Sequence, residues 1–227
     1  MTKKKPIFQN AKFEATGETK DFFGVTLHRI RAVADIAAIG LSAGTLGGWI
    51  AKEGNLSVHD NAWVYGNAQV YGNARVYGNA RVYGDAQVYG DAWVSGDAWV
   101  YGNALVYGDA RVYGNVQVYG NAQVYGNAWV YGNAQVYGNA RVSGNARVSE
   151  VNLTAVRSDN FTFSIVATPE GARIIAGCRY FSFEEAEKHW RETRGGTPLG
   201  DETFDILELL RKQAERHGLM EPTNEQA

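Results

Sequence analysis

The stretch of chain that decides the fold runs from residue 64 to residue 88 and reads VYGNAQVYGNARVYGNARVYGDAQV. Six-residue units with the pattern Tyr-Gly-Asn-Ala-x-Val follow one another in it without interruption. The pattern extends in both directions, so residues 53–148 read as sixteen hexads, with valine at every sixth position and Asn or Asp at every third. The repeat also explains why the chain contains 27 glycines and 13 tyrosines.

Each position of the hexad has a physical interpretation. Valine suits a half-buried strand because it is β-branched, and the Gly-Asn pair tolerates the positive φ of a bend. A short strand and a bend in every hexad predict a coil in which three hexads close one turn. An α-helix is excluded, because a glycine in every hexad would cost about 1 kcal/mol each. We therefore predict a mainly β fold, a parallel β-helix of about five 18-residue coils.

The hexads resemble those of left-handed parallel β-helix proteins, and Val64-Tyr65-Gly66-Asn67-Ala68 is a representative stretch. Together with residues 26–32, 46–50 and 55–57, they also resemble phage- and prophage-encoded hexapeptide-repeat proteins of uncharacterised function. This resemblance implies a left-handed coil, side-by-side packing into a homotrimer and a bacterial or phage setting. Counter-defence by binding a host protein is a further expectation that rests on the resemblance alone.

Residues 18 positions apart stack in such a coil, so the variable fifth position forms columns on the surface. One column consists of Arg75, Trp93, Arg111, Trp129 and Arg147. A second begins with Trp63, Arg81 and Trp99, and the first is flanked by Tyr77, Tyr113 and Tyr131. We interpret these residues as a binding surface, because Trp, Tyr and Arg are enriched at interface hot spots. The expected partner is another copy of the chain or a host protein; the alternative is a nucleotide-like planar ligand held between Trp and Arg.

The repeat requires caps at both ends, because a solenoid exposes its terminal coils. We predict an N-terminal arm and β cap at residues 1–52, with Trp49 lying across the first coil. The repeat domain covers residues 53–148. A C-terminal α+β domain follows at 149–218, and a flexible tail covers 219–227.

Within the C-terminal domain, the sequence predicts strands at 151–157, 161–168 and 172–176. Ser182 and Glu185 form a capping box that starts a helix, with Phe183, Ala186 and Trp190 on its buried face. Asp201 is predicted to cap a second helix of roughly 15 residues, which Gly218 ends.

The remaining residues carry no recognisable catalytic chemistry. The repeat contains one histidine, His59, whereas the resembled carbonic anhydrases bind zinc with three and the resembled acyltransferases use a histidine base. Cys178 and His189 form only a weak candidate pair, and acyl transfer remains a disfavoured alternative. We expect a non-enzymatic protein without cofactor or metal.

The charge balance and the single cysteine set further expectations. With 22 basic and 24 acidic residues, the chain lacks the positive surplus of general nucleic-acid binders. Cys178 has no partner for an internal disulfide, which suits the cytoplasm. The basic run in residues 1–6 precedes no apolar stretch, so neither a signal peptide nor a membrane span is expected.

Overall fold

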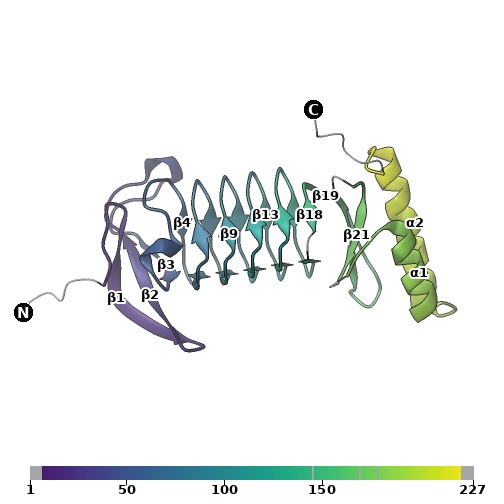
Figure 1. Cartoon of the computed structure of the whole chain (residues 1–227), viewed down its shortest axis with the longest axis horizontal. Coiled ribbons are helices and arrows are strands. Elements are labelled where there is room, and N and C mark those ends of the chain that lie inside the picture. Colours follow the sequence, from purple (N-terminus) through teal and green to yellow (C-terminus); the bar gives the residue numbers. More distant parts are fainter. Residues whose placement is uncertain (1–6, 145, 169, 178, 221–227) are drawn as a thin grey trace, which may run out of the picture.

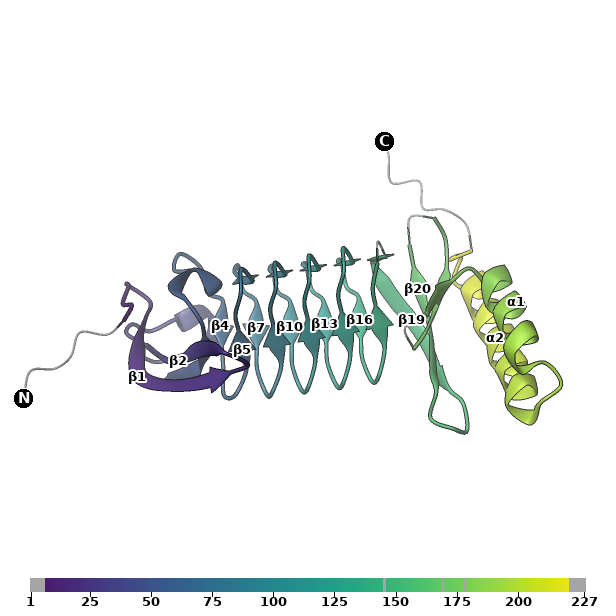
Figure 2. The ribbon, with the colours of Figure 1, turned by 60° about the horizontal axis from the view of Figure 1, so that its bottom comes forward.

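A computed structural model describes residues 7–144, 146–168, 170–177 and 179–220. An N-terminal β cap, a solenoid and a C-terminal sheet with two helices follow one another along a single axis (Figure 1). The successive coils lie side by side between the hairpin and the C-terminal sheet in both ribbon views (Figures 1 and 2). The fold is therefore a mainly β solenoid with two C-terminal helices.

Short two-residue strands form the three faces of the solenoid. The Arg–Trp face consists of β6 (Arg75–Val76), β9 (Trp93–Val94), β12 (Arg111–Val112), β15 (Trp129–Val130) and β18 (Arg147–Val148). The Trp63 face consists of β4 (Trp63–Val64), β7 (Arg81–Val82), β10 (Trp99–Val100), β13 (Gln117–Val118) and β16 (Gln135–Val136). The Gln face consists of β5 (Gln69–Val70), β8 (Gln87–Val88), β11 (Leu105–Val106), β14 (Gln123–Val124) and β17 (Arg141–Val142).

The strands of each face are parallel, and paired residues lie three hexads apart in sequence, as Arg111 pairs with Trp93 and with Trp129. The Arg111 amide donates to the Ala128 carbonyl at 2.9 Å, and equivalent bonds join the other coils. The valines and alanines of the repeat from residue 62 to residue 148 are at most 6% exposed. The predicted parallel β coil is confirmed, with valine inside and the fifth position outside in every hexad strand except the first, where the N-terminal cap buries Trp63.

The coil begins before the regular repeat does. The last two residues of β3 (Leu46–Ile50) pair in parallel with β5, Trp49 with Gln69 and Ile50 with Val70, a separation slightly longer than three hexads. Leu56 bridges to Val76 over the same longer separation. The first turn therefore holds two extra residues, and Leu56 rather than Val58 is buried in the core. Because β3 adds a crossing, the Gln face is crossed six times, so the solenoid has about six turns instead of the predicted five.

The N-terminal cap is built from β1 (Phe13–Phe22) and β2 (Val25–Ala32), which pair antiparallel and continue into β3. Two short 3-10 helices, η1 (Ala37–Ile39) and η2 (Glu53–Asn55), complete it. The prediction that Trp49 covers the first coil is wrong. Its indole lies on the outside, 4.5 Å from the Lys20 Nζ and 5.2 Å from the Arg29 guanidinium carbon. Trp63 occupies the buried position beneath the cap, at 0% exposure.

The C-terminal sheet closes the other end of the coil. It contains β19 (Glu150–Val156), β20 (Thr162–Ala167), β21 (Arg173–Ala176) and β22 (Arg179–Phe181), all antiparallel. The three predicted strands are present, and β22 is a fourth that the sequence did not indicate. Val166 and Ile175 join the solenoid core, whereas Phe163, Ile165 and Ile174 pack with the helices. The sheet is therefore sandwiched between the last coil and the helices.

Helix α1 (Phe183–Arg194) begins with the predicted capping box, in which the Ser182 hydroxyl accepts from the Glu185 amide at 3.1 Å. Helix α2 (Pro198–Arg216) starts earlier than predicted. The prediction that Asp201 caps it is wrong, because Thr197 is the N-cap and Pro198 fills the first helical position, where its missing N–H costs nothing. Of the predicted tail, Leu219 and Met220 pack against this core, and residues 221–227 lie outside the described residues.

Candidate functional site

The Arg–Trp face carries a continuous stack of guanidinium and indole groups. Because the valine of each strand points inward, the preceding residue points outward, and the 18-residue register places these residues above one another. The Arg–Trp separations run from 4.8 to 5.9 Å along the stack of Arg75, Trp93, Arg111, Trp129 and Arg147. Each exposed cation–π pair contributes about 0.5–1 kcal/mol. The predicted alternation of Arg and Trp is therefore present as a physical stack.

Tyrosines from the preceding coil support both indoles of this face, of which Trp93 is exposed and Trp129 is half-buried. Tyr77 meets Trp93 edge to face, with centroids 6.3 Å apart, and Tyr113 meets Trp129 in the same way at 6.4 Å. Tyr131 stacks on Tyr113 at 5.5 Å. The three flanking tyrosines predicted from the sequence thus lie beside the stack. They hold the indoles in fixed orientations, which reduces the conformational entropy that a partner would have to remove.

The spacing of the stack leaves no room for a planar ligand between Trp and Arg. Adjacent coils are joined by backbone hydrogen bonds of about 2.9 Å, and the Arg111 guanidinium lies 5.0 Å from one indole and 4.9 Å from the next. A ring inserted between two planar groups needs a gap of about 7 Å, twice the contact distance of carbon atoms. Only the edges of the stack are accessible, and Trp93 is 37% exposed. The face therefore suits a flat partner surface better than an intercalated ring.

The second predicted column lies on the Trp63 face and is only partly at the surface. Trp99 is 38% exposed and lies 5.2 Å from the Arg81 guanidinium carbon. Trp63, predicted as part of the same binding column, is instead fully buried. Its ring meets Phe13 of the cap at 6.4 Å. Trp63 is therefore a core residue and contributes nothing to an exposed surface.

A hollow of about 460 Å³ opens at the N-terminal end of the Arg–Trp face. Close to Gly54 at its rim, the Asn55 side chain is buried, and its amide donates to the Ala74 carbonyl at 2.8 Å. The hollow is lined by Lys52, Gly54, Asn73, Arg75, Asp91, Trp93, Asp109 and Arg111. Sequence reasoning missed Lys52, because it lies before the first hexad, where the repeat pattern does not indicate which face a side chain joins.

Stacked tyrosines run along the other two faces. On the Gln face, Tyr71, Tyr89, Tyr107 and Tyr125 stack with centroids 4.9 Å apart. Burial, reinforced by the neighbouring Tyr89, raises the pKa of Tyr71 to about 12. Burial also raises the pKa of Tyr89 and Tyr107. The stack therefore favours neutral phenols.

Raising the pH above 10 is expected to destabilise the solenoid. An unfolded chain loses its tyrosine protons near pH 10, whereas the stacked phenols hold theirs to higher pH. Their contribution to stability is therefore fully present below pH 10 and is lost as the pH rises towards 12. Thermal melts from pH 8 to 11.5, read together with tyrosinate absorbance, test this. In Tyr71→Phe the melting temperature should fall less steeply with pH than in the wild type. An unchanged wild-type melting temperature up to pH 11.5 would contradict the expectation.

The described residues contain no group of three or more His, Cys, Asp or Glu side chains placed to hold a metal ion. His59 lines a second hollow of about 640 Å³ beside Tyr77 and Trp93. Cys178 lies outside the described residues, so its candidate pairing with His189 has no geometry to report. No helix within the described ranges has the length and apolar character needed to cross a membrane.

Comparison with known proteins supports the architecture. A family model described as the YdcK β-solenoid repeat matches the chain at residues 68–84, 74–90, 86–102, 98–114, 104–120, 122–134 and 134–150. These matches lie within the solenoid and its junction with β19, and they include neither the N-terminal cap nor the helices. A search of curated proteins gave no match.

Proposed function

We propose that this β-solenoid repeat protein is a non-enzymatic interaction scaffold whose Arg–Trp face binds protein. One observation carries the proposal: a stack of five alternating Arg and Trp residues whose edges are exposed and whose ring faces are already filled. Such an arrangement combines rigid aromatic edges with fixed cationic donors, the residue types that dominate interface hot spots.

In this proposal the chain first binds copies of itself, and three chains pack side by side as a trimer. A straight, flat face of stacked coils is suited to a copy of itself, and the hexapeptide-repeat proteins that the sequence resembles pack in this way. The same resemblance supplies the finer expectations of a left-handed coil, a phage-encoded origin, a location in the bacterial cytoplasm and counter-defence by binding a host protein. The host protein would then bind the surfaces that the trimer leaves free.

Replacing both Trp93 and Trp129 with glutamate is expected to convert the trimer into a folded monomer of 24.9 kDa. The substitutions remove both indoles from the contact and free the arginines that stacked on them, so charged groups that are costly to desolvate replace the flat aromatic surface. Light scattering coupled to size exclusion gives the mass, and circular dichroism confirms folding. Trp99→Glu is the control, because Trp99 lies on another face and is as exposed as Trp93. A wild-type monomer, or dissociation by the control as well, would refute self-association through this face.

A second candidate function is binding of a nucleotide or another small anionic aromatic ligand. The observation that favours it is the hollow of about 460 Å³, where Trp93 lies beside the cations Lys52, Arg75 and Arg111. Asp91 and Asp109 line the same hollow and oppose an anion. A thermal-shift screen of nucleotides on wild-type protein and on Lys52→Ala separates the two functions, since only the ligand-binding function predicts a shift that Lys52→Ala removes.

A further inference from the structure

A second basic cluster lies far from the Arg–Trp face, in the C-terminal domain. A hollow of about 270 Å³ is lined by Arg157, Phe161, Arg179, His189, Trp190, Thr193 and Arg194. These residues come from three separate segments: the turn between β19 and β20, the start of β22, and the second half of α1. Three arginines and a histidine therefore converge on one small cavity, although they are scattered over nearly forty positions of sequence.

The charged side chains that line this hollow are all basic. None of the described residues that line it carries a carboxylate. The guanidinium groups of Arg179 and Arg194 form no ion pair within the described ranges, whereas Arg157 is paired with Asp159. Glu192 lies near enough to act on His189 electrostatically, but so does Arg179. Two unpaired arginines and one histidine remain to attract an anion.

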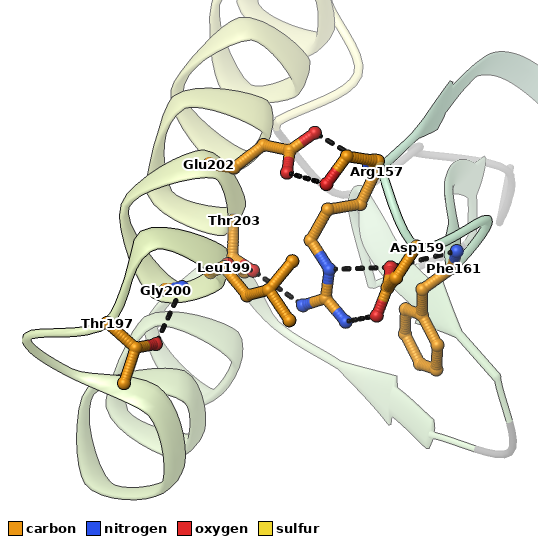
Figure 3. A network of polar contacts seen from close by, with 9 residues as sticks. Arg157, Asp159, Phe161, Thr197, Leu199, Gly200, Glu202 and Thr203 are labelled. Atoms are coloured by element: carbon orange, nitrogen blue, oxygen red, sulfur yellow. Dashed lines mark hydrogen bonds and ion pairs between the residues drawn. The ribbon is translucent and has the colours of Figure 1, made fainter.

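Arg157 lies at the edge of this hollow, and Figure 3 shows the hydrogen bonds that hold its side chain. Its Nε and Nη2 donate to the two oxygens of Asp159 at 2.9 and 2.7 Å, and its Nη1 donates to the Thr203 hydroxyl at 2.8 Å. The residue is 2% exposed. The next residue, Ser158, donates through its hydroxyl to Glu202 at 2.6 Å, which ties the turn to α2. The wall of the hollow is therefore preorganised, and Arg157 is a positioning residue rather than a free donor.

The size of the hollow limits what it can hold. A volume of about 270 Å³ is below the 300–1,000 Å³ or so of cavities that enclose drug-sized ligands. It accommodates a phosphate group with a few waters, but not a whole nucleotide. Arginine matches this group because its planar fork of N–H donors complements phosphate oxygens. Phe161 and Trp190 add apolar walls on which the organic part of an ester can rest.

We propose that this hollow binds a phosphate group, as the free dianion or as a small phosphate monoester, through Arg179, Arg194 and His189. The site shares no residue with the Arg–Trp face. It gives the C-terminal domain a recognition function in addition to closing the last coil.

The test is to titrate the full-length protein with sodium phosphate at constant ionic strength and to monitor the His189 ring by NMR. A parallel titration with sodium chloride measures the response to an anion that is not phosphate. Burial and the nearby Arg179 lower the pKa of His189 in the free protein, and a bound dianion should raise it. Phosphate is expected to bind saturably, and Arg179→Gln or Arg194→Gln should each weaken binding by about tenfold or more. Both side chains are exposed, so neither change should unfold the domain.

Arg216→Gln is the matched control, because it removes the same charge from an exposed position at the end of α2. It should change phosphate affinity by less than about twofold, because Arg216 does not line the hollow and salt screens a charge that makes no direct contact with the ligand. Phenyl phosphate distinguishes the two proposed ligands. If it binds more tightly than inorganic phosphate, the ligand is a phosphate monoester; if it binds more weakly, the ligand is the free phosphate ion. Absence of saturation, an equal response to chloride, or an equal loss in the control would overturn the proposal.

Discussion

Replacing Gly96 with alanine is expected to lower the free energy of unfolding by about 2–5 kcal/mol. Two effects combine at this bend. The φ of Gly96 is +67°, in the left-handed region that costs other residues about 1–2 kcal/mol. An added Cβ would also lie 2.7 Å from the backbone nitrogen of Gly114 in the next coil. Backbone cannot move aside as a side chain can, so the coils would have to separate and stretch their hydrogen bonds.

The matched control for this substitution is Gly138→Ala. Gly138 has nearly the same φ, +64°, but no heavy atom lies within 4 Å of the Cβ that alanine would add. This change should cost only the conformational part, about 1–2 kcal/mol. Urea unfolding followed by circular dichroism measures both values. If the two variants lose the same stability, the close approach of stacked glycines is not what excludes a side chain from the bends.

The second large effect is expected at Trp63, where alanine should lower the free energy of unfolding by about 3–5 kcal/mol. The indole is fully buried and its N–H has no hydrogen-bond partner in the described structure, so it stabilises through packing alone. It fills the space between Phe13 of the cap and the first coil. Its loss leaves a cavity at the joint between cap and solenoid.

Trp99→Ala provides the comparison, because Trp99 occupies the same hexad position on the same face, two coils further along. It is 38% exposed and contacts Arg81 and Tyr83, so its removal should cost about 1–2 kcal/mol, the sum of an exposed cation–π contact and an aromatic pair. Thermal and urea unfolding of both variants test the difference. Equal losses would mean that the cap does not pack on Trp63 as described.

The hexad pattern was sufficient to predict the coil, its 18-residue register and the side of each strand that faces inward. It was not sufficient to separate Trp63 from Trp99, because both residues lie in the same Ala-Trp-Val-Tyr-Gly stretch. Only a distant segment, the strand that contains Phe13, distinguishes them. The two extra residues of the first turn were missed for a similar reason: Val58 continues the sequence pattern, although Leu56 makes the bridge to Val76.

The C-terminal domain shows the same limit. The capping box at Ser182 could be predicted because it is a local arrangement of two side chains three residues apart. The start of α2 was placed too late, since Asp201 is a good cap by type, yet Thr197 followed by Pro198 is a better one. The basic hollow could not be predicted, because Arg157, Arg179 and Arg194 are brought together only by the packing of β19, β22 and α1.

The 18-residue register also fixes the rotational phase between the two ends of the molecule. Each hexad advances the chain by one face, so the N-terminal hairpin and the C-terminal helices emerge at an angle set by the number of hexads between them. A gene that gains or loses three hexads changes the length of the prism but keeps both ends in the same orientation. Losing a single hexad would instead turn one end by a third of a revolution relative to the other.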